Sequence, residues 1–190
     1  MRLFYASFLG PENAKSYDSL VAGVISCVPD TIRPVPPGTQ HLTIAFLGDV
    51  ADGDVPTCLQ VLETASEIDA FSFTLSPPRI LFARRSPRLV CVDLASESER
   101  VSMLQKHLYK GLSDRLPAPI TPPKLPHITL ARFRKNASRE ATRRVIESFS
   151  QRDEPSVTRT DYLIEVQLVR STLTPKGPIY ESIGESRCRT

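Results

Sequence analysis

The chain has 190 residues, of which 41% are hydrophobic and 24% charged, and its formal net charge at neutral pH is +3. This length and composition are typical of one soluble globular unit, or of two small lobes that share a core, and give no reason to expect disorder. No stretch approaches the roughly 18 apolar residues of a membrane-spanning helix. The N-terminus lacks the features of a signal peptide.

The four cysteines, Cys27, Cys58, Cys91 and Cys188, form no Cys-x-x-Cys pair. Cys27 and Cys91 fall in apolar segments, where thiols usually lie in a hydrophobic core. Scattered core cysteines are typical of a reducing compartment. We therefore expect a cytoplasmic protein with inert thiols.

The first half of the chain predicts a strand, helix, strand unit followed by a second helix. Pro11 opens a helix whose apolar residues recur at helical spacing until Pro29 ends it. The predicted order is a strand at 3–9, this helix, a stiff proline-rich connector at 34–38, a strand at 41–47, a helix at 56–68 and a strand at 71–75.

The second half begins with a predicted hairpin that has a basic tip. Ser96 and Glu99 then stand at capping-box spacing and open a helix. The predicted elements are strands at 80–83 and 89–94 around a turn at 84–88, a helix through 112, a proline-rich connector at 117–126, a strand at 127–133, a helix at 138–149, a strand at 162–169 and a short final strand after 174–180. Strands and helices do not alternate strictly, which favours an α+β fold with largely antiparallel sheets.

Two pentapeptides share one sequence pattern, and each of them lies in a predicted strand. His41 to Ala45 and His127 to Ala131 read histidine, aliphatic, threonine, aliphatic, alanine, and start 86 residues apart. Side chains alternate between the faces of a strand, so each copy places His and Thr on one face and its two aliphatic residues on the other. The spacing suggests two similar halves that each supply one His-Thr pair.

Two histidines that face one cavity form an acid-base pair. Imidazole titrates near neutral pH, so one ring can accept a proton while the other donates one. The hydroxyls of Thr43 and Thr129 point the same way in this interpretation and can bind phosphate oxygens. Together these groups would stabilise a phosphoryl transition state without a metal.

Other uses of these residues have less support in the sequence. No Asp, Glu or Cys at metal-ligand spacing accompanies His41 or His127, so we expect no metal. The third histidine, His107, falls beside the apolar stripe of its helix and is interpreted as a surface or boundary residue. There is no nucleophile elbow, phosphate loop or dinucleotide-binding glycine motif, so no cofactor is expected.

Basic residues gather beside two of the predicted elements. Solvated surface charge is the simpler explanation at any single position, but their grouping favours contact between some of them and phosphate. One group is Arg79, Arg84, Arg85 and Arg88 around the hairpin, and the other is Arg132, Arg134, Lys135, Arg139, Arg143 and Arg144 after the second motif.

These motifs resemble those of the two-histidine (2H) phosphoesterase superfamily. The most similar branch is that of bacterial and archaeal RNA 2′,3′-cyclic phosphodiesterases, historically called 2′-5′ RNA ligases. Besides both His-x-Thr motifs, the resemblance rests on Arg2-Leu3-Phe4, Phe46-Leu47-Gly48, Leu130-Ala131-Arg132, Ser171, Leu173 and Gly177-Pro178-Ile179-Tyr180, and so covers nearly the whole chain.

The resemblance implies a bilobal, pseudo-twofold α+β fold. Residues 1–190 would form one catalytic domain of two intertwined lobes, each contributing one motif to a central cleft. It also implies hydrolysis of RNA 2′,3′-cyclic phosphate ends, with tRNA ends as one candidate, to 2′-phosphomonoesters, and a related ATP-independent 2′-5′ ligation. We assign His127 as proton acceptor and His41 as proton donor, and expect Thr43 and Thr129 to hold the phosphate. One chain supplies both motifs, so we expect a monomer.

Arg132 matches an arginine that lies near the substrate phosphate in relatives. Strict alternation from His127 would point Arg132 to the opposite face, so this assignment requires a bulge or twist at the strand end. Two alternative functions stay open at this point. One is a non-catalytic binder of RNA ends or nucleotides, and the other is a phosphodiesterase acting on small cyclic nucleotides or on ADP-ribose cyclic phosphate.

Overall fold

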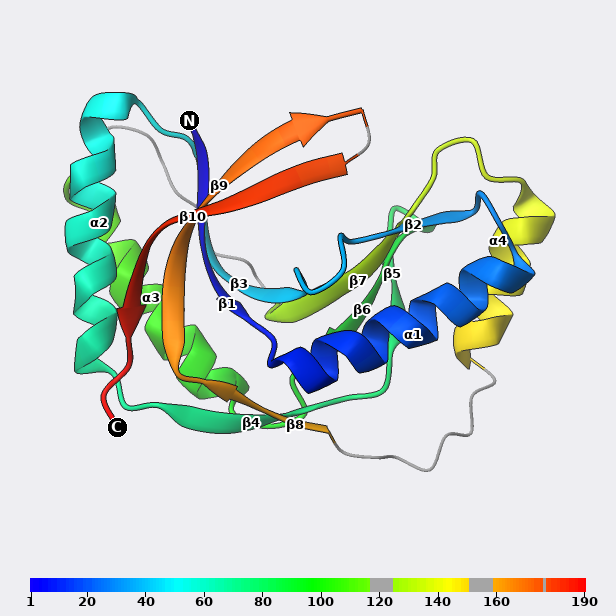
Figure 1. Cartoon of the computed structure of the whole chain (residues 1–190), viewed down its shortest axis with the longest axis horizontal. Coiled ribbons are helices and arrows are strands. Elements are labelled where there is room, and N and C mark those ends of the chain that lie inside the picture. Colours follow the sequence, from blue (N-terminus) through cyan, green and yellow to red (C-terminus); the bar gives the residue numbers. More distant parts are fainter. Residues whose placement is uncertain (117–124, 151–158, 176) are drawn as a thin grey trace.

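The computed structural model describes residues 1–116, 125–150, 159–175 and 177–190 (Figure 1). Its centre is an antiparallel sheet in the order β10-β9-β1-β3-β7-β6-β5, and β2 also pairs with β7. The strands are β1 (Arg2–Phe8), β2 (Ile32–Pro34), β3 (His41–Asp49), β5 (Arg79–Ala83), β6 (Ser86–Asp93), β7 (His127–Phe133), β9 (Glu165–Thr174) and β10 (Gly177–Arg187). A separate ladder joins β4 (Phe71–Leu75) to β8 (Arg159–Leu163).

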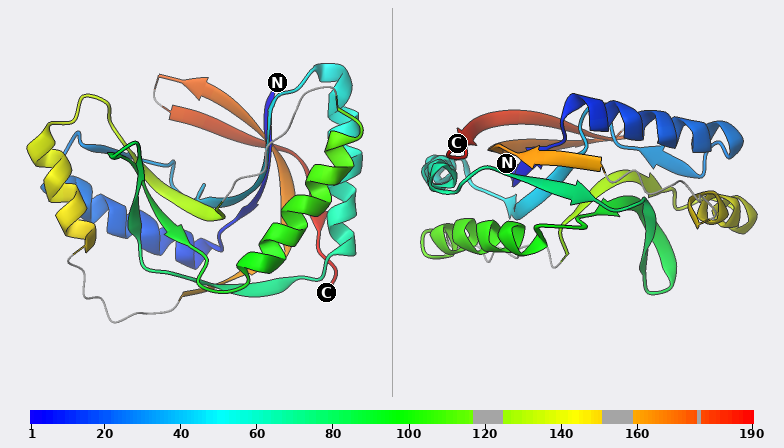
Figure 2. Two further views of the ribbon diagram at one scale, coloured as in Figure 1. Left: turned by 180° about the vertical axis from the view of Figure 1, so that it is seen from behind. Right: turned by 90° about the horizontal axis from the view of Figure 1, so that it is seen from below.

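Four helices, α1 (Pro11–Cys27), α2 (Val55–Glu63), α3 (Ser98–Ser113) and α4 (Arg139–Ser150), surround the sheet in the part of the chain that the structure describes. The helix α2 lies against β9 and β10, with α3 beside it, and α4 lies against β5 (Figure 1, Figure 2). Two of the helices each pack against a strand that is distant in sequence order. The helix α1 follows β1 but contacts β7 as well as β2, and α3 follows β6 but contacts β3. None of the described helices is long and apolar enough to span a membrane.

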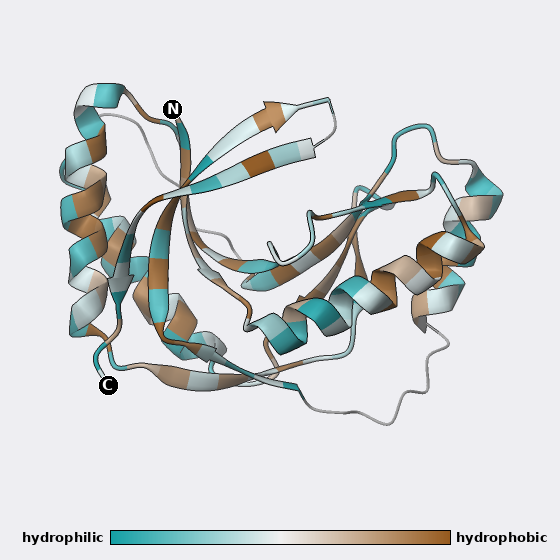
Figure 3. Cartoon of the chain, viewed as in Figure 1, coloured by the Kyte–Doolittle hydropathy of each residue, from teal (hydrophilic) through white to brown (hydrophobic). Residues whose placement is uncertain are grey.

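The helices bury the faces that their sequence periodicity predicts. Tyr17, Val21 and Val24 of α1 are each at most 3% exposed, and they recur at the three- and four-residue spacing of one helix face. On α3 the buried stripe is Val101, Leu104, Leu108 and Leu112. Colouring by hydropathy shows apolar stripes on the helices alongside polar surfaces (Figure 3). The α+β class and the antiparallel sheet are therefore confirmed.

Several predicted boundaries are wrong in ways that tertiary pairing explains. The region predicted as one strand at 162–169 is two strands: β8 pairs with β4, β9 pairs with β1, and the exposed Ile164 separates them. The connector at 34–38 begins with Pro34 at the end of β2, where a proline is tolerated because β2 is a short outer strand. The helix at 56–68 ends at Glu63 and continues as a 3₁₀ turn, Thr64–Glu67.

The predicted capping box is also wrong. Ser96 does not cap α3 but accepts a hydrogen bond from the Thr74 N–H at 3.0 Å, so it fastens the helix entry to β4. Glu97, at φ 61°, precedes the helix without a side-chain cap. The basic hairpin turn has two residues instead of five, because β6 begins at Ser86.

Three further expectations concern the cysteines, the last strand and the second proline-rich connector. Cys27 is exposed, so it is not a core thiol, whereas the other three cysteines are buried. The final strand, β10, spans 11 residues and is not short. The connector at 117–126 lies outside the described residues over 117–124.

Candidate active site

The two motif strands are neighbours at the centre of the sheet. Leu42 of β3 pairs with Ile128 of β7 in antiparallel register. This register sets His41 opposite Thr129, and Thr43 opposite His127. Leu42 and Ile128 are 1% and 0% exposed, while the two His and two Thr residues are half-buried. The four polar side chains therefore share one face of the sheet, and the apolar residues fill the other.

Each histidine makes the same hydrogen bond to the backbone two residues earlier. The His41 Nδ1 lies 2.7 Å from the Thr39 carbonyl oxygen, and the His127 Nδ1 lies 2.9 Å from that of Leu125. A carbonyl oxygen can only accept, so both Nδ1 atoms carry a proton and donate it. The Nε2 atom of each ring is thus left for proton transfer: it accepts when the ring is neutral and donates when the ring is charged.

His41 is enclosed by three aromatic rings. Its ring centroid lies 5.1 Å from that of Phe4, 5.4 Å from Phe8 and 5.2 Å from Tyr180. Burial lowers the pKa of His41 below its ordinary value, and the charges of Arg132 and His127 lower it further against the opposing effect of the hydrogen bond to Thr39. These effects disfavour the charged form of His41 in the free protein, and an anionic phosphate bound beside the ring would favour that form.

Both motif strands carry a bulge at the fourth residue of the pentapeptide. Tyr5 pairs with Ala45 and Ala6 with Thr43, which leaves Ile44 without a partner in β1. Likewise Val90 pairs with Ala131 and Cys91 with Thr129, which leaves Leu130 without a partner in β6. An extra residue shifts the alternation by one position. The residues at the sixth position, Phe46 and Arg132, therefore turn to the face that carries the histidines.

A cavity of about 310 Å³ confirms this change of face. His41 and Thr43 line it together with Phe46 and Arg132. The other lining residues are Arg2, Phe4 and Arg33, and Ser171, Leu173, Pro178 and Tyr180 from the β9–β10 hairpin. His127 and Thr129 do not line this cavity, although the register places them next to it on the same face.

Three arginines make the cavity electropositive. Arg33 and Arg132 lie directly opposite each other on β2 and β7, an unfavourable pairing of like charges that an anion between them would relieve. Arg2 stacks on Phe46, with its guanidinium carbon 4.9 Å from the ring centroid. The charges of these three arginines oppose the rise that burial causes in the pKa of Tyr180. The arrangement suits a phosphate group bound near His41.

No sequence motif marks Arg33 as a site residue, and Tyr180 was expected only through the family resemblance. Arg33 reaches the site through β2–β7 pairing, which has no local sequence signal. The third histidine, His107, lies elsewhere, with its Nε2 3.0 Å from the Thr64 hydroxyl. The described residues contain no cluster of three or more His, Cys, Asp or Glu side chains suited to a metal ion.

Comparisons with known proteins identify the family of this chain. The model of the 2′-5′ RNA ligase superfamily matches residues 29–172. An RNA 2′,3′-cyclic phosphodiesterase of Thermus thermophilus is 31% identical over an alignment that covers 95% of this chain and 86% of that protein.

Two solved structures share the fold over almost their whole length. TT0787 of Thermus thermophilus has a TM-score of 0.76 and 27% identity, with 98% of this chain and 97% of that chain covered. LigT of E. coli, solved with 3′-AMP, has a TM-score of 0.71 and 21% identity, with 100% and 98% covered. The chain belongs to the 2′-5′ RNA ligase superfamily of 2H phosphoesterases.

Proposed function

We propose that this protein hydrolyses the 2′,3′-cyclic phosphate at the end of an RNA to a 2′-phosphomonoester, with His41 and His127 as its acid-base pair. Family membership and the name of the 31% identical relative support hydrolysis of a phosphodiester bond. The observation that carries the mechanism is the matched pair of hydrogen bonds from Nδ1 to a backbone carbonyl, on adjacent strands. Both Nε2 atoms are thereby left for proton transfer on one face of the sheet.

The proposed step needs one water molecule and two protonation states. The neutral Nε2 of His127 takes a proton from water while the water oxygen bonds to phosphorus. The bond from phosphorus to O3′ breaks, and the protonated Nε2 of His41 gives its proton to the departing oxygen. The products are a 3′-hydroxyl and a 2′-phosphate, and the histidines recover their starting states by exchange with solvent. No metal takes part in this proposal.

The non-bridging oxygens of the phosphate need donors that hold them through the transition state. We assign this role to the hydroxyls of Thr43 and Thr129, which face the histidines across the β3–β7 pair, and to Arg132. Within the described part of the chain, neither hydroxyl makes another hydrogen bond and Arg132 forms no ion pair. Donors without another partner are available to stabilise the charge that develops on the oxygens.

One chain of residues 1–190 supplies both histidines, so we propose that a monomer works as one catalytic domain with two intertwined lobes. The same groups can act with a 5′-hydroxyl in place of water as the nucleophile. His127 would take the proton from the 5′-hydroxyl as its oxygen bonds to phosphorus, the bond to O3′ would break, and His41 would protonate the departing O3′. ATP is not consumed, because the energy of the cyclic ester drives the 2′-5′ ligation.

The test is hydrolysis of an oligoribonucleotide that ends in a 2′,3′-cyclic phosphate, with the products identified by ³¹P NMR. Wild type should yield the 2′-phosphate, and His41→Ala and His127→Ala should each lose on the order of 10²- to 10⁴-fold in rate. His107→Ala is the matched control and should keep the wild-type rate, because His107 lies outside the site.

Three results would contradict the proposal. Full activity in either single variant would exclude the paired mechanism. Binding of the RNA end without turnover in wild type would favour the non-catalytic binder, and turnover confined to cyclic mononucleotides would favour a small-molecule phosphodiesterase.

A further inference from the structure

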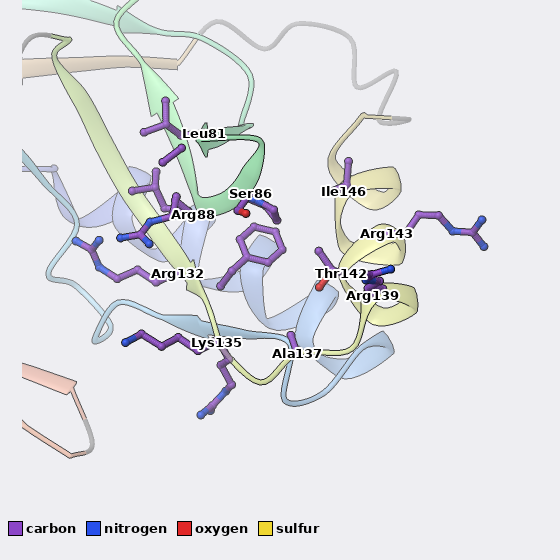
Figure 4. Close-up of a pocket in the computed structure, with 15 residues that line it drawn as sticks. Leu81, Ser86, Arg88, Arg132, Lys135, Ala137, Arg139, Thr142, Arg143 and Ile146 are labelled. Atoms are coloured by element: carbon purple, nitrogen blue, oxygen red, sulfur yellow. The ribbon is translucent and has the colours of Figure 1, made fainter.

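A second hollow lies beside the His41 cavity and is strongly basic. It has a volume of about 750 Å³ and lies between the β5–β6 hairpin, the end of β7 and α4 (Figure 4). Six cationic residues line it, namely Arg88, Arg132, Arg134, Lys135, Arg139 and Arg143, and its described lining includes no carboxylate. We call this hollow the α4 groove.

The α4 groove is continuous with the candidate active site through Arg132. Arg132 lines both the groove and the His41 cavity, and it also lines a hollow between them together with Arg33 and Lys135. An anionic chain whose end lies beside His41 thus meets further cations when it leaves past Arg132.

Most of these charges have no ion-pair partner among the described residues. Arg143 pairs with Glu147 at 3.5 Å and extends away from the groove (Figure 4). Among the residues that the structure describes, Arg88, Lys135 and Arg139 form no ion pair. Free cations grouped in a concave surface attract a polyanion and restrict it to one path.

Three arginines are placed where local structure disfavours them. Arg84 and Arg85 form the two-residue turn of the β5–β6 hairpin at φ 49° and 66°, a conformation that favours glycine or asparagine. They lie between Ala83 and Ser86, which both line the groove. Arg139 is the first residue of α4, where a cation opposes the helix dipole. All three arginines therefore occupy positions that local structure disfavours, as is common at functional sites.

We propose that the α4 groove binds the sugar-phosphate backbone of single-stranded RNA on the 5′ side of the terminal phosphate. This inference rests on the proposed function, because it places the RNA end beside His41 and His127. It makes the preferred substrate an RNA chain of several nucleotides instead of a cyclic mononucleotide. The contacts are with phosphates, so they favour length and not base sequence.

The experiment measures binding, which does not require hydrolysis. A fluorescein-labelled short single-stranded RNA ending in a 3′-phosphate is titrated with protein at several KCl concentrations. The test variant is Arg88→Gln with Arg139→Gln, one from each wall of the groove. The control is Lys106→Gln with Lys110→Gln, an equal change of charge at exposed positions on α3.

We expect the groove variant to bind the RNA on the order of tenfold more weakly at low salt. The slope of log affinity against log salt should fall by about 1.4, since each single-strand phosphate contact contributes about 0.7. The α3 control should bind as wild type does. A labelled mononucleotide 3′-phosphate should bind more weakly than the RNA, and the groove variant should lose most of this difference.

Three results would overturn the proposal: wild-type affinity and slope in the groove variant, an equal loss in the α3 control, or binding of polyglutamate as tight as that of the RNA. Two further outcomes distinguish a failure of the groove proposal from a failure of the proposed function. Wild type that binds the RNA through the groove but leaves a 2′,3′-cyclic phosphate intact would refute the proposed function alone. Wild type that hydrolyses a cyclic mononucleotide as readily as an RNA end, and binds both equally, would refute the groove alone.

Discussion

Arg132→Gln tests the bulge that turns this side chain toward His41. Without the unpaired Leu130, residue 132 would face away from the histidines, and its replacement would have little effect on catalysis. In the observed register, Arg132 lines the His41 cavity. A charged hydrogen bond to phosphate contributes about 1.5–3 kcal/mol. At about 1.36 kcal/mol per tenfold change in rate, kcat/KM should fall roughly 10- to 150-fold.

The assay is hydrolysis of a cyclic mononucleotide, which does not extend into the α4 groove. Arg134→Gln is the matched comparison, because Arg134 lines the groove but not the His41 cavity, and it should lose much less activity. The unfolding temperature of Arg132→Gln should not fall below that of Arg134→Gln, since removing Arg132 relieves its opposition to Arg33. A loss of less than about twofold in Arg132→Gln, or an equal loss in Arg134→Gln, would refute the role of the bulge.

Three other predictions concern pH, metal and stability. With His41 as donor, kcat/KM should fall as pH rises through the depressed pKa of His41. Phe8→Ala exposes the His41 ring and should move this alkaline limb of the pH profile to higher pH. If Phe8→Ala moves the acidic limb of the profile instead, His41 is the acceptor. Excess EDTA should leave the initial rate unchanged, and a loss restored by a divalent cation would disprove the metal-free mechanism. Asp161→Ala should lower the free energy of unfolding by about 2–4 kcal/mol in urea titrations, because this buried carboxylate accepts hydrogen bonds from the Gly10 N–H and the Asn13 amide. As a control, Asp69→Ala breaks the exposed ion pair with Arg189 and should lower the free energy of unfolding by less than about 1 kcal/mol.

Hydrophobic periodicity in the sequence predicted the helices and strands that have one consistent buried face. The helices α1 and α3 and both motif strands fall close to their predicted ranges, because each has one consistent buried face. The split between β8 and β9 could not be predicted, since both segments favour a strand and only their different partners separate them. Ser96 had the pattern of a cap, but a neighbouring strand bound its hydroxyl instead.

The candidate site was predictable where the motif is local. His41, Thr43, His127 and Thr129 come to one face because the alternation of a strand requires it. Arg33 has no such pattern and reaches the site only when β2 pairs with β7. The bulges also have no local marker, because aliphatic residues occupy both positions and no glycine stands there. Their positions emerge only from the pairing of each motif strand with its outer neighbour.

The repeated pentapeptide provides matched geometry, and the surroundings provide the difference that acid-base chemistry needs. Each copy holds its Nδ1 on the carbonyl two residues earlier and has a bulge at its fourth residue. Three aromatic rings surround His41, whereas none contacts His127 within the described part of the chain. The sixth residue is Phe46 in one copy and Arg132 in the other. Two histidines in identical surroundings would titrate alike, so the unequal surroundings are what separates a donor from an acceptor.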